Sequence, residues 1–90
     1  MQIEFDSTKR DRTIADRGLD FARAVDMFAG KHLTQADTRT DYAEDRFVTV
    51  GWIDERLVVV VWTPRGEARR IISMRRINER EIKAIGTALD

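Results

Sequence analysis

The stretch from residue 46 to residue 75 most constrains the fold, because it predicts three consecutive β-strands joined by short turns. Residues 46–53 alternate, with Val48, Val50 and Trp52 on one face. Residues 57–63 are apolar at almost every position, which is typical of a central strand buried on both faces. Residues 68–75 form the third strand. The chain therefore has to build a sheet, and we expect both tryptophans to lie in its core.

Helical patterns flank these strands along the chain. Asp6 or Ser7 can cap a weakly apolar helix over residues 8–17, which Gly18 can end in a left-handed conformation. Asp20 caps a second helix, and apolar residues on one face of that helix predict contact with a core. This apolar stripe consists of Phe21, Ala24, Val25, Met27 and Phe28.

Three further segments complete the predicted order. Residues 2–5 alternate and predict a short strand, whereas residues 31–44 are polar and predict a loop with some extended structure. Asn78 and Glu81 have capping-box spacing, which predicts a last helix over residues 79–88. The order β-α-α-β-β-β-α indicates a single α+β domain over residues 1–90, in which helices pack on one face of a small antiparallel sheet. The other face would form a shallow, exposed floor.

Composition excludes several classes of protein. With 42% hydrophobic and 36% charged residues, the chain is neither a membrane protein nor too polar to collapse. Its longest apolar run, over residues 57–62, is far shorter than the roughly 20 residues of a membrane span. The first ten residues contain no apolar segment typical of a signal peptide. No cysteine is present and His32 is the only histidine, so disulfides, thiolate catalysis and His-rich metal sites are excluded.

The charge is balanced overall but unevenly distributed. The formal net charge is +0, yet acidic residues dominate the first half of the chain and basic residues the second. Thirteen of the 16 cationic side chains are arginine, which binds phosphate through two parallel hydrogen bonds. A GC-rich genome would also explain this arginine content. A nucleic-acid ligand is one interpretation and coding bias is the other.

Cations concentrate around the last predicted strand. Alternation places Ser73 and Arg75 on the exposed floor, where Arg46 from a neighbouring strand can join them. A row of guanidinium groups there would bind a phosphodiester backbone. Arg70 would face the other way from Arg75 unless a bulge or the strand end intervened. The alternative interpretation is that these arginines keep the sheet soluble and prevent edge pairing.

A second group of candidates precedes the central strands. These candidates are Tyr42, Glu44 and Arg46. The Tyr42 ring could stack on a base, the Glu44 carboxylate could accept a proton, and the Arg46 guanidinium could hold a phosphate. The alternative is an ion pair beside a half-buried aromatic ring. Lys9 is either a phosphate ligand or an ordinary surface lysine.

Several motifs together point to one family. They are Ile3-Glu4-Phe5-Asp6 with Lys9, Gly18-Leu19-Asp20-Phe21, the series Asp37, Arg39, Tyr42, Glu44 and Arg46, and Arg70-Ile71-Ile72-Ser73 with Arg75 and Arg76. Over residues 2 to about 81, the chain resembles BrnT, the toxin component of a bacterial type II toxin–antitoxin pair. It departs from that family's usual pattern at Asp16-Arg17, where Lys-His is usual, and at Ala43, Met74 and Ile85.

The resemblance implies a RelE-like fold and a cytoplasmic ribonuclease that inhibits translation without a metal ion or other cofactor. The implied partner is a cognate BrnA-like antitoxin with a ribbon-helix-helix part, through which alone the pair would bind operator DNA. No membrane partner is implied. One alternative is a catalytically weak subunit that acts mainly in an autorepressor complex. Another is an unrelated α+β interaction module.

The resemblance also implies a set of site residues. The implied catalytic residues are Glu44, Arg46, Arg70, Ser73 and Arg75, with Glu44 as the base and the arginines as phosphate ligands. The implied RNA-binding residues are Lys9, Arg17, Tyr42, Arg65 and Arg76.

Overall fold

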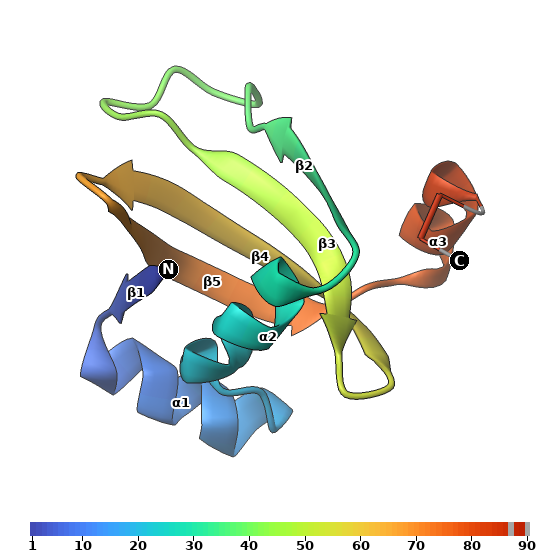
Figure 1. Ribbon diagram of the computed structural model, residues 1–90, viewed down its shortest axis with the longest axis horizontal. Coiled ribbons are helices and arrows are strands. Elements are labelled where there is room, and N and C mark those ends of the chain that lie inside the picture. Colours follow the sequence, from blue (N-terminus) through green and yellow to red (C-terminus); the bar gives the residue numbers. More distant parts are fainter. Residues whose placement is uncertain (87, 90) are drawn as a thin grey trace.

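A five-stranded sheet forms the centre of the computed structural model, which describes residues 1–86 and 88–89 (Figure 1). The strands are β1 (Gln2–Phe5), β2 (His32–Ala36), β3 (Phe47–Ile53), β4 (Arg56–Arg65) and β5 (Ala68–Arg76). The helices are α1 (Ser7–Arg17), the 3₁₀ turn η1 (Phe21–Arg23), α2 (Ala24–Ala29) and α3 (Glu79–Ile85). The strand order is β1-β5-β4-β3-β2, in which β1 runs parallel to β5 and the other neighbours are antiparallel. The predicted α+β class is confirmed.

The predicted three-strand meander is present, and β4 lies at its centre. Val58 and Val59, neighbours that point to opposite faces of this strand, are both buried, as expected for a strand covered on both faces. Helix α2 packs over β3 at Gly51, where an added Cβ would lie 2.6 Å from the side chain of Met27. Glycine at this position therefore allows the helix to approach the sheet closely.

The helical side of the core differs from the predicted stripe at one position. Phe21, Ala24, Met27 and Phe28 are buried, but Val25 is 41% exposed. The reason is that residues 21–23 form a 3₁₀ turn, which has about three residues per turn. Ala24 consequently lies above Phe21, and Val25 rotates toward solvent.

Strand β2 is an element to which the sequence pattern gave no bounds, because residues 31–44 were expected to form a loop with some extended structure. It pairs with β3 along its whole length and adds one strand to the expected order. As an edge strand, it is mostly exposed on both faces, so its side chains show little alternation. The backbone hydrogen bonds that β2 makes with β3 hold it in the sheet instead.

One face of the sheet carries α1 and α2, and we call the opposite face the open face. The prediction that all helices pack on one face is wrong in one respect, because α3 lies against the open face. Ala84 and Ile85 of α3 line a cleft together with Val48 and Val50, and Figure 1 shows α3 set apart from α1 and α2. The capping box of α3 is present, but the helix ends before the predicted residue 88, and residue 87 lies outside the described residues.

The two tryptophans occupy different environments. Trp62 is buried in the core as predicted, whereas Trp52 is 39% exposed. Strand alternation explains the error, because Gly51 and Ile53 face the core and Trp52 therefore faces the other side. The Trp52 indole N–H donates to the carbonyl oxygen of Leu89 at 3.3 Å.

A β-bulge in β5 changes which residues share a face. Val61 pairs with Ser73 but Trp62 pairs with Ile71, so Ile72 is an extra residue in β5. As a result Ile71 and Met74, three positions apart, are both buried in the core. The same shift brings Arg70 to the face of Ser73 and Arg75.

No helix in the described part of the chain is long and apolar enough to cross a membrane.

Candidate functional site

A cleft of about 380 Å³ lies on the open face, and we call it the central cleft. Strands β3, β4 and β5 form its floor, the end of β2 and the segment after it form one wall, and α3 contributes one residue. Its lining residues are Gln35, Ala36, Asp37, Thr38, Arg39, Val48, Val59, Val61, Ser73, Arg75 and Glu81. The predicted position of Ser73 and Arg75 on the open face is therefore reproduced.

Arg75 is held at the edge of the central cleft by α3. Its two Nη atoms donate to the two carboxylate oxygens of Glu81, both at 2.7 Å. Hydrogen bonds from Arg75 and from the backbone N–H of Asn78 lower the pKa of Glu81 to about 2. Glu81 therefore stays ionised near neutral pH. Sequence analysis had given it a capping role only, and a pairing with Arg75 leaves no signal in the sequence pattern.

Asp37 and Arg39 form the facing wall of the central cleft. The Asp37 carboxylate accepts from Arg39 Nε and Nη2, both at 2.8 Å, and from the Tyr42 hydroxyl at 3.1 Å. These hydrogen bonds hold the pKa of Asp37 well below its usual value, and those from the Arg39 side chain have the largest effect. Sequence analysis found both residues within the family motif but gave neither a role.

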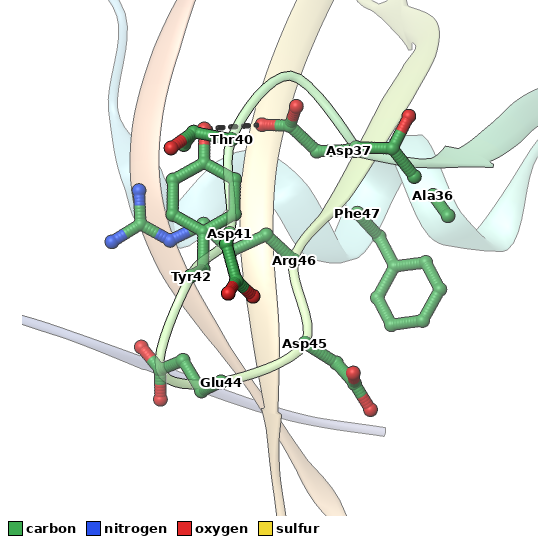
Figure 2. Close-up of a pocket in the computed structure, with 10 residues that line it drawn as sticks. Ala36, Asp37, Thr40, Asp41, Tyr42, Glu44, Asp45, Arg46 and Phe47 are labelled. Atoms are coloured by element: carbon green, nitrogen blue, oxygen red, sulfur yellow. Dashed lines mark hydrogen bonds between the residues drawn. The ribbon is translucent and has the colours of Figure 1, made fainter.

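Glu44 and Arg46 lie in a neighbouring cleft of about 420 Å³, the loop cleft, which Figure 2 shows. Ala36, Asp37 and Thr38 line both clefts, so the two lie on either side of Asp37. The remaining residues that line the loop cleft are Thr40, Asp41, Tyr42, Glu44, Asp45, Arg46 and Phe47.

The polar groups of the loop cleft contact one another. The guanidinium carbon of Arg46 lies 4.1 Å from the centre of the Tyr42 ring, so one face of that ring is covered (Figure 2). The Arg46 Nε is buried and has no hydrogen-bond partner in the described part of the chain. The Glu44 carboxylate lies 3.4 Å from Arg65 Nη2. Tyr42, Glu44, Arg46 and Arg65 are thus brought together, but apart from Arg75.

A third cleft of about 240 Å³, the α1 groove, runs between α1 and β5. Lys9 and Arg17 line it, as does Arg12, which sequence analysis did not identify. Ser73 lines both this groove and the central cleft. Arg17 Nη1 donates to the Met74 carbonyl at 2.8 Å, which fixes α1 against β5.

Three predicted site residues do not line any of these three clefts: Arg65, which contacts Glu44, and Arg70 and Arg76. Arg70 is on the open face, but at the β1 edge, where its Nη1 is 3.8 Å from the Glu4 carboxylate. Arg76 follows Arg75 in β5, so alternation directs it to the opposite face. The structure groups the remaining residues around Ser73 and Asp37.

The central cleft and the α1 groove carry cations that suit an anionic polymer, whereas four carboxylates and one arginine line the loop cleft. Lys9 and Arg17 lie on one side of Ser73, and Arg75 with Arg39 lies on the other. Such a strip can contact several phosphates of one strand. Among residues 1–86 and 88–89, no group of three or more His, Cys, Asp or Glu side chains could hold a metal ion.

Comparison with protein families gives a match that covers most of the chain. Residues 5–81 match the family described as the ribonuclease toxin, BrnT, of type II toxin–antitoxin systems. The matched range contains every candidate site residue from Lys9 to Glu81. A comparison with curated proteins gave no match.

Proposed function

Because the chain belongs to the BrnT family of ribonuclease toxins of type II toxin–antitoxin systems, we propose that it cleaves RNA without a metal ion in the clefts around Ser73 and Asp37. The observation that carries this proposal is the strip of cations that α1 and β5 contribute on the two sides of Ser73. Cationic side chains can neutralise the charge that a metal ion neutralises in other nucleases.

The proposed reaction is an internal transesterification. The ribose 2′-oxygen attacks the adjacent phosphorus, and the bond from phosphorus to the 5′-oxygen breaks. A base removes the 2′-hydroxyl proton, and an acid protonates the leaving oxygen. Arg75 donates to the phosphate oxygens that gain charge in the transition state. It has five N–H groups, of which Nη1 and Nη2 each donate one to Glu81 and Nη1 donates another to the Arg76 carbonyl at 3.3 Å, so two donors remain for a phosphate.

The other site residues take roles that follow from their clefts. Glu44 is the proposed base, and its half-exposed carboxylate keeps access to a strand that crosses from the central cleft into the loop cleft. Arg46 and Arg70 are further phosphate ligands, and the Ser73 hydroxyl donates to a phosphate where two clefts meet. The proposed RNA-binding residues are Lys9, Arg17, Tyr42, Arg65 and Arg76.

A toxin of this family has a cognate antitoxin. We propose a BrnA-like antitoxin whose acidic segment or amphipathic helix covers the open face, and whose ribbon-helix-helix part carries the pair to operator DNA. The cations at this face and the apolar side chains of β3 beside them would both be covered.

A second candidate function is a weakly catalytic subunit of an autorepressor complex. The Arg75–Glu81 pair favours this alternative, because both Nη atoms of Arg75 already have a carboxylate partner.

The test uses full-length toxin separated from its antitoxin, incubated with RNA in EDTA. We expect cleavage, and we expect Arg75→Ala to abolish most of it. Arg56→Ala is the matched control, because Arg56 is an exposed arginine at the β3–β4 turn, outside the clefts. Cleavage that depends on added divalent metal would contradict the mechanism, and absence of cleavage by the wild-type protein would support the second candidate.

A further inference from the structure

Two arginines from different elements line the central cleft. Arg39 comes from the segment after β2 and Arg75 from β5, and both line the cleft. Hydrogen bonds that Arg75 donates to Glu81 raise the pKa of Arg75, whereas the positive charge of Arg39 lowers it. The two cations are therefore close enough to repel one another. A cleft that brings two like charges together favours an anion between them.

Arg39 is presented to the solvent by a buried carboxylate. Its side chain is 73% exposed, whereas that of Asp37 is 1% exposed. Asp37 accepts from Nε and Nη2 of Arg39, and also from its backbone N–H at 3.3 Å. Binding through Nε and Nη2 leaves Nη1 and one hydrogen of Nη2 available to a ligand.

Asp37 is itself fixed from three directions. Tyr42 donates its hydroxyl to the carboxylate, and the Asp37 backbone N–H donates to the Arg46 carbonyl at 2.8 Å. Exposed ion pairs are usually mobile and contribute little to stability. A buried acceptor with this many partners instead holds one guanidinium in a single orientation, and pre-organisation of that kind is what tight ligand binding requires.

We propose that Arg39 is a second phosphate-binding residue of the central cleft, that Asp37 is the positioning residue that orients it, and that Arg39 and Arg75 hold one phosphodiester of RNA between them. The proposal rests on the proposed ribonuclease function and adds two residues to its site. Arg39 contacts the substrate, whereas Asp37 acts only through Arg39.

The test measures binding of an RNA oligonucleotide that carries 2′-O-methyl groups and therefore cannot be cleaved. We expect Arg39→Gln to weaken binding about tenfold, the effect of losing a charge-assisted hydrogen bond. The slope of log affinity against log salt should fall by about 0.7, which is the loss of one phosphate contact on a single strand. Arg39→Lys should restore the slope but only part of the affinity, because lysine keeps the charge and loses the fork.

Arg23→Gln is the matched control, because Arg23 is also exposed and also paired with two carboxylates. Its Nε lies 2.6 Å from Asp26 and its Nη2 lies 2.7 Å from Asp54, outside the three clefts. This variant should bind RNA as the wild type does. If Arg39→Gln and Arg23→Gln bind equally well, the proposal is overturned.

Asp37→Asn tests the positioning role. It should weaken binding while the salt slope stays near the wild-type value, because the Arg39 charge remains. In the double variant with Arg39→Gln, Asp37→Asn should cause no further loss, whereas an independent structural role would make the two losses add. If Asp37→Asn does not fold, the Arg39 variants alone decide the matter. Loss of binding in Arg75→Ala but not in Arg39→Gln would refute this inference alone, whereas loss in neither would refute the proposed function.

Discussion

Replacing Glu81 by glutamine separates two effects of the carboxylate on Arg75. Glutamine is also accepted at the third position of a capping box, so the start of α3 is preserved. The ion pair with Arg75, made through two hydrogen bonds of 2.7 Å, is lost. A phosphate that approaches Arg75 has to compete with Glu81 in the wild type, but has no charged competitor in this variant.

The size of the effect follows from the exposure of the pair. The Arg75 side chain is 43% exposed and that of Glu81 is 31% exposed, so solvent screens their interaction. Partly exposed pairs contribute about 1 kcal/mol. Glu81→Gln should therefore lower the midpoint of thermal unfolding by about 4–8 °C, as expected for a domain of this size. RNA affinity should rise, but by no more than about fivefold.

Two measurements on one preparation check this reasoning. Thermal unfolding reports the stability lost, and binding of 2′-O-methyl RNA reports the competition removed. Asn78→Ala is a suitable control, since it weakens the cap of α3 and leaves Arg75 with its partner. Weaker RNA binding by Glu81→Gln would refute the argument, because it would show that Glu81 orients Arg75 for the substrate and does not compete with it.

Three further predictions follow from the same contacts. Arg75→Ala should reduce cleavage roughly 10²–10³-fold, the scale of losing one donor to a transition-state oxyanion, while a melting curve shifts by no more than in Glu81→Gln. Acid should destabilise the protein, because folding lowers the pKa of Asp37 and lowers that of Glu81 to about 2. Both carboxylates therefore stabilise the folded state at pH values above their unfolded pKa, and this stabilisation is lost as the pH falls from about 4.5 toward 2. Equilibrium unfolding at several pH values should show this slope, and a flatter one in Glu81→Gln. Lastly, the antitoxin complex should bury roughly 1,500 Å² or more of surface and persist when salt screens the exposed ion pairs. The test is to co-express the toxin with the adjacent gene product and run size-exclusion chromatography in low and in high salt. Failure of the two proteins to co-elute would contradict the prediction.

Local side-chain patterns predicted those elements that have buried faces or well-defined caps. Strand β4 has buried residues on both faces, and the capping residues at Asp6, Asp20 and Asn78 all make the expected hydrogen bonds. These features depend on neighbours within a few residues, so the sequence carries them directly. Strand β2 depends on pairing with a strand more than ten residues away, and its mostly exposed side chains carry no record of that pairing.

In the candidate site, too, only those features that depend on neighbouring residues in the chain were predictable. Ser73 and Arg75 share the open face because both follow the bulge, where alternation is regular. The partners of the arginines were not predictable. Glu81 had an evident local role in its capping box, and nothing in the pattern indicated that α3 would turn its carboxylate toward β5.

The bulge at Ile72 decides whether Arg70 lies on the same face of the sheet as Arg75. Five positions separate these arginines, an odd number that would place them on opposite faces of a regular strand. A substitution at Ile72 changes one side chain. Deletion of that residue would instead remove the bulge together with the extra position, so Arg70 and Arg75, then four positions apart, would still share a face of a regular strand. In this part of β5 the bulge, and not the spacing of the two arginines alone, decides that both lie on the open face.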